Sequence, residues 1–328
     1  MKFFISLTFL LAAAFSINAQ DFNLLVGTYT EPGKSEGIYV YNFNGATGAV
    51  TPKSKAVGLT NPSFLTVSKN GKFVYAVSES SDAESGVTAF AFNRNTGDLN
   101  LLNFAKTRSG GPCYVSVTAD NKYAFAANYG GGSLSAFKIN SGGTLDSNVQ
   151  LIQNSGSGVN KQRQESPHVH AAVISPDQKY LLSADLGTDK INIYNIANNA
   201  GKQIITPAAT PFLAVKPGSG PRHLTFHPNG QYVYLVQELV GAVSVFDYKN
   251  GRLALKQYIS MLHKSDTGSV GAADIHVSPD GKFLYASNRG DANKLAIYKI
   301  NKNGTLQLAG HQSTMGKAPR NFAIDPTG

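Results

Sequence analysis

A pattern that recurs about every 50 residues constrains the fold of this chain more than any other feature of its sequence. Each copy has a short alternating strand, a turn rich in Gly, Asn or Asp, and a second apolar strand, as in GPRHLTFHPNGQYVYLVQE (220–238) and GAADIHVSPDGKFLYASNR (271–289). The residues just before the turn are Lys69, Ala119, Pro176, Pro228, Pro279 and Pro326. Repeats of this length, built from short strands and tight turns, are typical of β-propeller blades.

One repeat divides into the four strands of a blade. HLTFH (223–227) alternates, PNG turns, and YVYLVQ (232–237) returns, while AVSVFDY (242–248) and ALKQYIS (254–260) supply a third and a fourth strand. We therefore predict an all-β propeller without a helix of more than two turns. Its blades are expected to begin near residues 62, 112, 168, 221, 272 and 319.

The two ends of the repeat region are unlike the middle. LLVGTYT (24–30) and GIYVYNF (37–43) are interpreted as the second and third strands of a blade without its first strand. APRNFAIDPTG (318–328) opens a sixth repeat and stops after one turn. We expect one propeller domain over residues 20–328 that is incomplete at its C-terminal end. The alternative is that residues 318–325 close a six-bladed ring.

The first residues have the three parts of a secretory signal peptide: a lysine, an apolar run, and small residues ending at Ala19. We predict a signal peptide over residues 1–19 and an exported mature chain that begins near Gln20, in the periplasm or outside the cell. The apolar run is too short for a comfortable membrane span, and no second one follows. Cys113 is the only cysteine, so no disulfide within the chain can stabilise the fold.

The formal net charge of +9 does not by itself indicate a nucleic-acid partner. Lysine and arginine are spread along the chain without a basic helix or a stacked aromatic motif, which argues against nucleic-acid binding. A basic exported protein is the simpler interpretation, and a positive potential that attracts an acidic small molecule stays open. The oligomeric state cannot be inferred.

Two columns of the repeat change residue type from blade to blade, whereas a structural column stays apolar. The apolar column is Val74, Ala124, Leu181, Val233 and Leu284. The start of the first strand has Ser63, Cys113, His170, Arg222, Ala273 and Arg320, and the end of the second has Glu79, Tyr129, Leu186, Glu238 and Arg289. Because the two strands form a hairpin, both places lie at one mouth of the channel. Such divergence indicates either a site shared by several blades or solvated loop edges.

In two pairs of residues in these strands, the members are two positions apart, so their side chains lie on the same face of the strand. His168 and His170 could bind a metal, but no third ligand is evident, so we predict no metal and no cofactor. Asp274 and His276 form a similar pair, and Asp274 aligns with His223 one position inside the mouth. A carboxylate–histidine hydrogen bond and a structural histidine both stay open at this place.

Several segments resemble the seven-bladed propeller lactonase family, which includes propeller-type 6-phosphogluconolactonases and carboxy-cis,cis-muconate cyclases. They are GPRHLTFHPNGQYVYLVQEL, AADIHVSPDGKFLYASNRG, ESPHVHAAVISPD and ADLGTDKI, within a likeness that runs from residue 27 to 322. In that family a His, two Arg and a Glu are the proposed active-site groups. By motif, the resemblance implies that these groups are His170, Arg222, Glu238 and Arg289 here.

The resemblance implies an exported lactonase that hydrolyses the ester of a sugar-derived or otherwise acidic lactone. Arg222 and Arg289 would hold the anionic group and stabilise the oxyanion. His170 or Glu238 would be the base, and His170 is favoured because a carboxylate between two arginines stays ionised. Nearby substrate-binding groups are expected at Asn128, His168, His223, Asp274, His276 and Arg320.

Two other functions remain open. The same groups, run in reverse, would suit a muconate-cyclase-like lyase or isomerase. A binding propeller without catalysis would present the mouth, with exposed aromatic residues such as Tyr129, to a glycan or a protein. The export signal also departs from the phosphogluconolactonases, which act in the cytoplasm on an intermediate of central metabolism.

Overall fold

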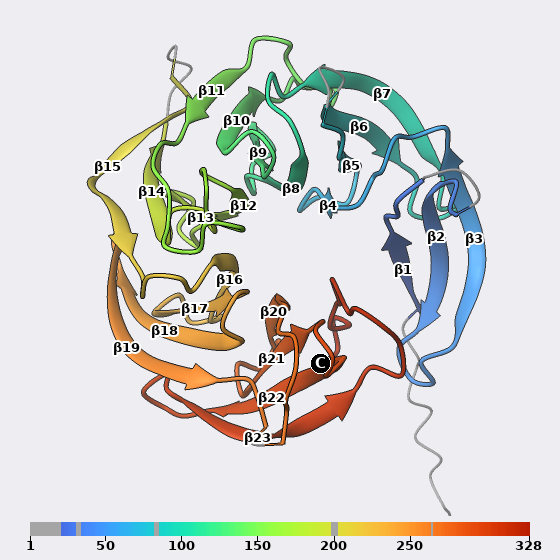
Figure 1. Cartoon of the computed structure of the whole chain (residues 1–328). Coiled ribbons are helices and arrows are strands. Elements are labelled where there is room, and N and C mark those ends of the chain that lie inside the picture. The colour runs from blue at the N-terminus through green and yellow to red at the C-terminus, as the bar shows by residue number, and fades with distance from the viewer. Residues whose placement is uncertain (1–20, 31–33, 82–84, 198–202, 264) are drawn as a thin grey trace, which may run out of the picture.

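The computed structural model describes residues 21–30, 34–81, 85–197, 203–263 and 265–328. These residues form strands, turns and loops and contain no helix, and their six antiparallel sheets surround a central channel (Figure 1). None of the described segments could therefore cross a membrane as an apolar helix. The predicted all-β propeller is confirmed. The predicted signal peptide, residues 1–19, lies outside the described residues.

Five sheets have four strands each, ordered from the channel outward. The first two are β4 (Leu65–Val67), β5 (Phe73–Ser78), β6 (Gly86–Phe92) and β7 (Leu99–Lys106), then β8 (Pro112–Val117), β9 (Tyr123–Asn128), β10 (Ser133–Lys138) and β11 (Gln150–Gln153). The third is β12 (Val169–Ile174), β13 (Tyr180–Asp185), β14 (Lys190–Ile196) and β15 (Ile205–Ala214). The last two are β16 (Pro221–Phe226), β17 (Tyr232–Gln237), β18 (Ala242–Lys249) and β19 (Arg252–Ser260), then β20 (Ala272–Val277), β21 (Phe283–Asn288), β22 (Lys294–Ile300) and β23 (Leu306–Ser313).

The sixth sheet has three strands, β1 (Asp21–Val26), β2 (Gly37–Asn44) and β3 (Val50–Val57). β1 pairs antiparallel with β2, which pairs with β3, as expected for a blade whose innermost strand is missing. Residues 318–325 do not form a strand. Asn321 and Phe322 instead hydrogen-bond to Asp274 of β20. The six-bladed closure by a strand over 318–325 is thus not observed.

The core lies between neighbouring sheets, where equivalent residues of the repeat are buried in the same way. All five members of the apolar column identified in the sequence are completely inaccessible to solvent. Tyr234 and Val243 pack against Leu284 and Tyr298 of the next sheet. Because each blade has the same packing needs, this column varies only among aliphatic residues. The fold therefore rests on the interfaces between blades.

The channel strands of four blades each contain a β-bulge at their first residues. The register shifts between Pro112 and Tyr114 in β8 and between Val169 and Ala171 in β12. The equivalent shifts in β16 and β20 fall at 221–224 and 272–275. A bulge adds one residue opposite the partner strand and redirects the local side chains. Four of the six residues in the first variable column, Cys113, His170, Arg222 and Ala273, lie in these bulges.

Candidate active site

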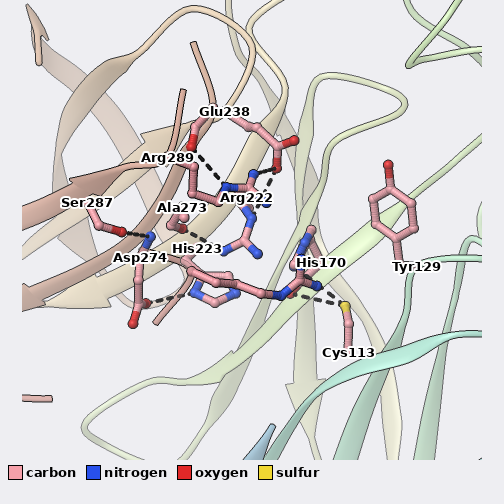
Figure 2. Close-up of polar contacts among 12 residues, drawn as sticks. Cys113, Tyr129, His170, Arg222, His223, Glu238, Ala273, Asp274, Ser287 and Arg289 are labelled. Carbon is pink, nitrogen blue, oxygen red and sulfur yellow. Dashed lines mark hydrogen bonds and ion pairs between the residues drawn. The ribbon is translucent and has the colours of Figure 1, made fainter. Parts of the chain in front are cut away.

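Glu238, directly after β17, lies at the centre of a cluster of three arginines. Its Oε2 is 3.0 Å from Arg222 Nε and 3.0 Å from Arg289 Nη2, and its Oε1 is 2.7 Å from Arg163 Nη2 (Figure 2 shows the first two arginines). Burial alone would favour the protonated carboxyl, but the three arginines keep the pKa of Glu238 below its usual value. Glu238 is therefore a carboxylate, and the four side chains together carry a net charge of +2.

The two arginines predicted from the repeat differ in their exposure. Arg222 comes from the bulge of β16, has a side chain only 1% exposed, and donates from Nη1 to the Ala273 carbonyl at 2.7 Å. Burial lowers the pKa of Arg222 to about 10, so it stays a cation at neutral pH. Arg289 follows β21, donates from Nε to the Gly271 carbonyl at 3.0 Å, and is 21% exposed. Arg289 therefore keeps an accessible face, whereas Arg222 is part of the interior.

Arg163 was not found by sequence reasoning. It lies in the long connection between β11 and β12 and donates to the Tyr129 hydroxyl at 3.3 Å as well as to Glu238. This connection is longer than the equivalent ones between the other blades and lies outside the repeated hairpins, so the comparison of repeats could not identify Arg163. The only signal was the unusual length of the connection.

His170 lies in the bulge of β12, on the channel side of the sheet. Its Nδ1 is 3.5 Å from Cys113 Sγ, and its ring is 5.3 Å from Tyr129 and 5.2 Å from His223, both edge-on (Figure 2). Burial, followed by the charge of Arg222, lowers the pKa of His170 well below its usual value. The imidazole is thus neutral at pH 7 and chemically able to accept a proton.

Asp274, in the bulge of β20, joins two histidines. His223 Nδ1 lies 2.8 Å from its Oδ1, and His276 Nε2 lies 2.9 Å from its Oδ2. Although burial favours the protonated acid, the hydrogen bonds from both histidines keep the pKa of Asp274 well below its usual value. The carboxylate–histidine hydrogen bond that the sequence left open is confirmed. His276 is the more exposed of the two histidines.

His168 does not have the free ring nitrogen that a metal ligand needs. Its Nδ1 is 3.0 Å from the Tyr129 carbonyl, its Nε2 is 3.0 Å from Glu165 Oε1, and its ring stacks on Tyr129 at 4.5 Å. Across the described ranges, no three His, Cys, Asp or Glu side chains are grouped as metal ligands would be. His168 thus supports Tyr129 at the edge of the arginine cluster.

Asn128 and Arg320, also predicted near the site, have different surroundings. Asn128 Nδ2 donates to the hydroxyls of Ser133 and Ser135 at 3.0 and 2.9 Å, so its amide group forms hydrogen bonds within its own sheet. Arg320 lies beside Glu79, the residue directly after β5, with its Nη2 3.7 Å from Glu79 Oε1. Arg320 therefore adds positive charge beside the cluster, and Asn128 supports the blade.

A small cavity lies inside the channel next to this cluster. About 10 Å³ of it is open to the centre of a water molecule, close to the space that one water needs. Its lining consists of Ser63, Phe64, Cys113, Arg222, His223, Arg320 and Asn321. Arg222 therefore connects the cavity with Glu238 and Arg289.

A much larger hollow of about 610 Å³ lies elsewhere, along β1. It is lined mainly by apolar side chains, among them Phe22, Leu24 and Phe92, and its ionisable groups are Lys69, Arg94 and Asp325. It has no histidine and no paired acid and base. Its size therefore does not make it the catalytic candidate, and the charged channel mouth remains the better one.

The sequence and the fold match one protein family over nearly the whole described chain. The family described as "Lactonase, 7-bladed beta-propeller" matches residues 23–328. A protein of Formosa agariphila named 6-phosphogluconolactonase is 40% identical over 309 residues, covering 93% of this chain and 87% of the relative. The 6-phosphogluconolactonase of Bacillus subtilis is 34% identical over 305 residues, covering 92% and 84%.

Two solved structures show the same likeness. The crystal structure of a putative 6-phosphogluconolactonase from Bacteroides fragilis has a TM-score of 0.88 and 45% identity, covering 94% of this chain and 86% of that one. The periplasmic gluconolactonase PpgL of Pseudomonas aeruginosa has a TM-score of 0.88 and 37% identity, with coverage of 94% and 87%. The likeness thus includes the blades that carry the arginine cluster.

Proposed function

Because this chain belongs to the seven-bladed β-propeller lactonase family, we propose that it hydrolyses the ring ester of an acidic, sugar-derived lactone of the 6-phosphogluconolactone type. The observation that carries the proposal is the cluster in which Arg163, Arg222 and Arg289 share the single carboxylate of Glu238. An excess of positive charge in a partly enclosed mouth attracts an anionic substrate. The names of the relatives agree with this substrate class.

The arginines supply two needs of the reaction. Guanidinium groups pair with phosphate or carboxylate in a fixed, forked geometry, and they stay charged at neutral pH. The same positive field stabilises the oxyanion that forms when water adds to the lactone carbonyl. Arg289 is suited to contact the substrate because it is partly exposed. The buried Arg222 contributes its positive charge from the interior.

The remaining need is a group that accepts a proton from water and returns it to the leaving alkoxide. Glu238 is a poor candidate because three arginines stabilise its ionised form. His170 and His223 are both neutral at pH 7 and lie 5.2 Å apart, ring to ring. The sequence favoured His170, and we propose that the proton acceptor is one of these two histidines.

We also propose that the protein is exported and acts in the periplasm or outside the cell. The support is the signal-peptide pattern of residues 1–19 together with a periplasmic gluconolactonase among the similar structures. Cell fractionation followed by N-terminal sequencing tests this proposal. The expected result is a mature chain that begins near Gln20 in the exported fraction, and an uncleaved chain in the cytoplasm would contradict it.

A matched pair of lactones tests the activity. The purified protein is assayed by acid release on 6-phosphoglucono-δ-lactone and on glucono-δ-lactone, which differ only in the phosphate. We expect hydrolysis above the spontaneous rate for both, with kcat/KM at least about tenfold higher for the phosphorylated ring, equivalent to one charge-assisted contact. No hydrolysis of either lactone would overturn the function. Equal kcat/KM values would overturn the role of the arginines in holding an anion.

A further inference from the structure

The ring of His223 has one engaged nitrogen and one that is not. The side chain is buried, with 4% of the residue exposed, and its Nδ1 is 2.8 Å from Asp274 Oδ1. The opposite ring nitrogen, Nε2, is enclosed and has no hydrogen-bond partner among the described residues. A buried polar atom without a partner is costly unless a water or a ligand meets it. His223 also lines the small cavity beside Arg222, which could hold such a water.

The surroundings of Asp274 determine which nitrogen of His223 carries the proton. Oδ1 also accepts from the backbone N–H of Ile275 at 3.0 Å. Oδ2 accepts from His276 Nε2 at 2.9 Å and from the Asn321 amide at 2.6 Å. A carboxylate surrounded by donors stays ionised and can only accept hydrogen bonds. The proton of neutral His223 is therefore on Nδ1, and Nε2 has a free lone pair.

The cavity is the right size for one reactant. Its volume of about 10 Å³ corresponds to a single water, and the residues that line it include Arg222, Arg320 and Ser63, which have polar side chains. A water there could accept a hydrogen bond from an arginine and donate one to His223 Nε2. Arg222 extends from this cavity to the cluster around Glu238, so the water would lie next to the place proposed for the anionic lactone.

We propose that His223, oriented by Asp274, is the general base of the lactonase reaction and that this cavity holds the hydrolytic water. This inference rests on the proposed function and refines it, because it assigns the proton transfer to His223 in place of His170. The polar group next to the His170 ring is the thiol of Cys113, at 3.5 Å from Nδ1. A neutral thiol cannot fix a tautomer or stabilise an imidazolium as a carboxylate does.

The proposed step balances without a further reactant. Water gives one proton to His223 Nε2 while its oxygen bonds to the lactone carbonyl carbon, and the carbonyl electron pair moves to the oxygen that the arginines stabilise. When the intermediate collapses, the ring C–O bond breaks and the proton on Nε2 passes to the departing alkoxide. Asp274 stays ionised throughout and stabilises the transient imidazolium. The carboxylic acid product then loses its remaining proton to solvent.

Parallel substitution of the two histidines tests the assignment. His223→Gln and His170→Gln keep similar volumes and are compared on the phosphorylated lactone. We expect His223→Gln to lower kcat by about 10²-fold or more with KM within about threefold, because a positioned base typically contributes 10²–10⁴-fold. His170→Gln should affect KM more than kcat. His227→Gln, a partly buried histidine at the far end of β16 that is bonded to the Gly281 carbonyl, is the control and should match the parent.

Asp274 is a positioning residue, and Asp274→Asn tests it with a readout that a merely structural role would not move. The substitution keeps the volume and removes the charge, so kcat should fall with little change in KM. In ¹⁵N NMR spectra of the parent protein, the His223 ring should show the Nδ1–H tautomer, and this signature should be lost in Asp274→Asn. Finding the Nε2–H tautomer in the parent would overturn the proposal even if both variants failed to fold.

The outcomes separate this inference from the proposed function. An active parent whose His223→Gln variant keeps its kcat while His170→Gln loses it would overturn the role of His223 and leave the lactonase function intact. A parent that hydrolyses neither lactone would overturn the function and the assigned base together. Circular dichroism and the Tm of each variant show whether a loss of kcat comes from unfolding.

Discussion

The two sides of the channel have equivalent backbone positions, but one side carries charged side chains there and the other carries uncharged ones. On one side, which we call the charged side, the starts of β16 and β20 and the ends of β17 and β21 carry Arg222, His223, Glu238, Asp274 and Arg289. Ion pairs link Arg222 and Arg289 to Glu238, and a hydrogen bond links His223 to Asp274 (Figure 2). Since every blade has the same hairpin, this concentration of charge is not a requirement of the fold.

The facing side, which we call the neutral side, consists of residues 63–64 before β4 and 113–114 in β8. Phe64 stacks on Tyr114 at 4.3 Å, and both rings contact the edge of His223, at 6.0 and 5.3 Å. Burial raises the pKa of the Cys113 thiol to about 12, so this group is also uncharged. The difference shows that the charged groups are concentrated on one side of the channel, whereas the facing side presents mainly aromatic and uncharged side chains to the same small cavity.

The largest effect should follow from Arg222→Ala, because this arginine is both buried and charged. The substitution leaves a cavity in the interior and removes the buried ion pair to Glu238 and the hydrogen bond to the Ala273 carbonyl, changes that together typically cost about 3–5 kcal/mol. We expect the Tm to fall by about 10 °C, judged from the usual Tm change for a chain of this size. We also expect kcat/KM to fall by about a hundredfold or more. Calorimetry and lactone assays on the same sample measure both quantities.

A residue at the mouth of a channel would be expected to contribute little to stability, but the side chain of Arg222 is only 1% exposed. Lys282→Ala is the matched control, since Lys282 lies on an exposed turn of the neighbouring blade and forms a surface ion pair with Asp280. Surface pairs contribute at most about 1 kcal/mol. If Arg222→Ala melts like Lys282→Ala, the charged side does not stabilise the fold.

Arg289→Ala should separate activity from stability. Arg289 is partly exposed and bonds to Glu238 from the edge of the cluster, while Arg222 and Arg163 still neutralise that carboxylate. We expect kcat/KM on the phosphorylated lactone to fall by about a hundredfold, the usual cost of one oxyanion-stabilising donor, with a Tm within about 3 °C of the parent. A variant with parental activity on the phosphorylated lactone would remove Arg289 from the substrate site.

The repeat predicted most of this arrangement and missed the parts that do not repeat. Arg222, Glu238 and Arg289 were found because they stand in columns of the repeat whose residue type changes from blade to blade. Arg163 was missed because the connection that carries it is longer than its equivalents and lies outside the repeated hairpins. The bulges were missed as well, since one added residue at the start of a strand hardly disturbs its alternation. Without the bulges, the sequence left two possibilities open for His223: a hydrogen bond to Asp274 or a purely structural histidine.

The pH dependence of stability tests the burial of His223 on the charged side. Groups that face its ring are Arg222, Asp274, His276, His170 and Tyr114. Burial, followed by the charge of Arg222, lowers its pKa to about 4, against about 6.5 in the unfolded chain. Between these values the unfolded chain binds more protons, so this contribution to stability is complete above about pH 6.5 and is lost as the pH falls toward 4.

Thermal melts at pH 7 and pH 5 measure this contribution. The two pKa values predict a loss of about 2 kcal/mol from His223 at pH 5, or about 5 °C in Tm. His223→Gln has no such proton, so its Tm should fall by about 5 °C less than that of the parent over the same pH change. Equal falls in Tm for the two proteins would mean that the pKa of His223 is not lowered by folding.

The smallest effect is expected on the neutral side, from Cys113→Ala. Cys113 occupies the same strand position as Arg222, lines the same cavity, and lies 3.5 Å from His170. Because burial keeps its thiol protonated, it is not a nucleophile in the ground state, and thiolate chemistry would require a lowered pKa. Cys113→Ala should therefore keep kcat/KM within about threefold of the parent, and thiol-alkylating reagents should not inactivate the folded enzyme. A loss of more than about tenfold in kcat with an unchanged Tm would show that the two sides share the chemistry, because the thiol would then act on the reaction through His170.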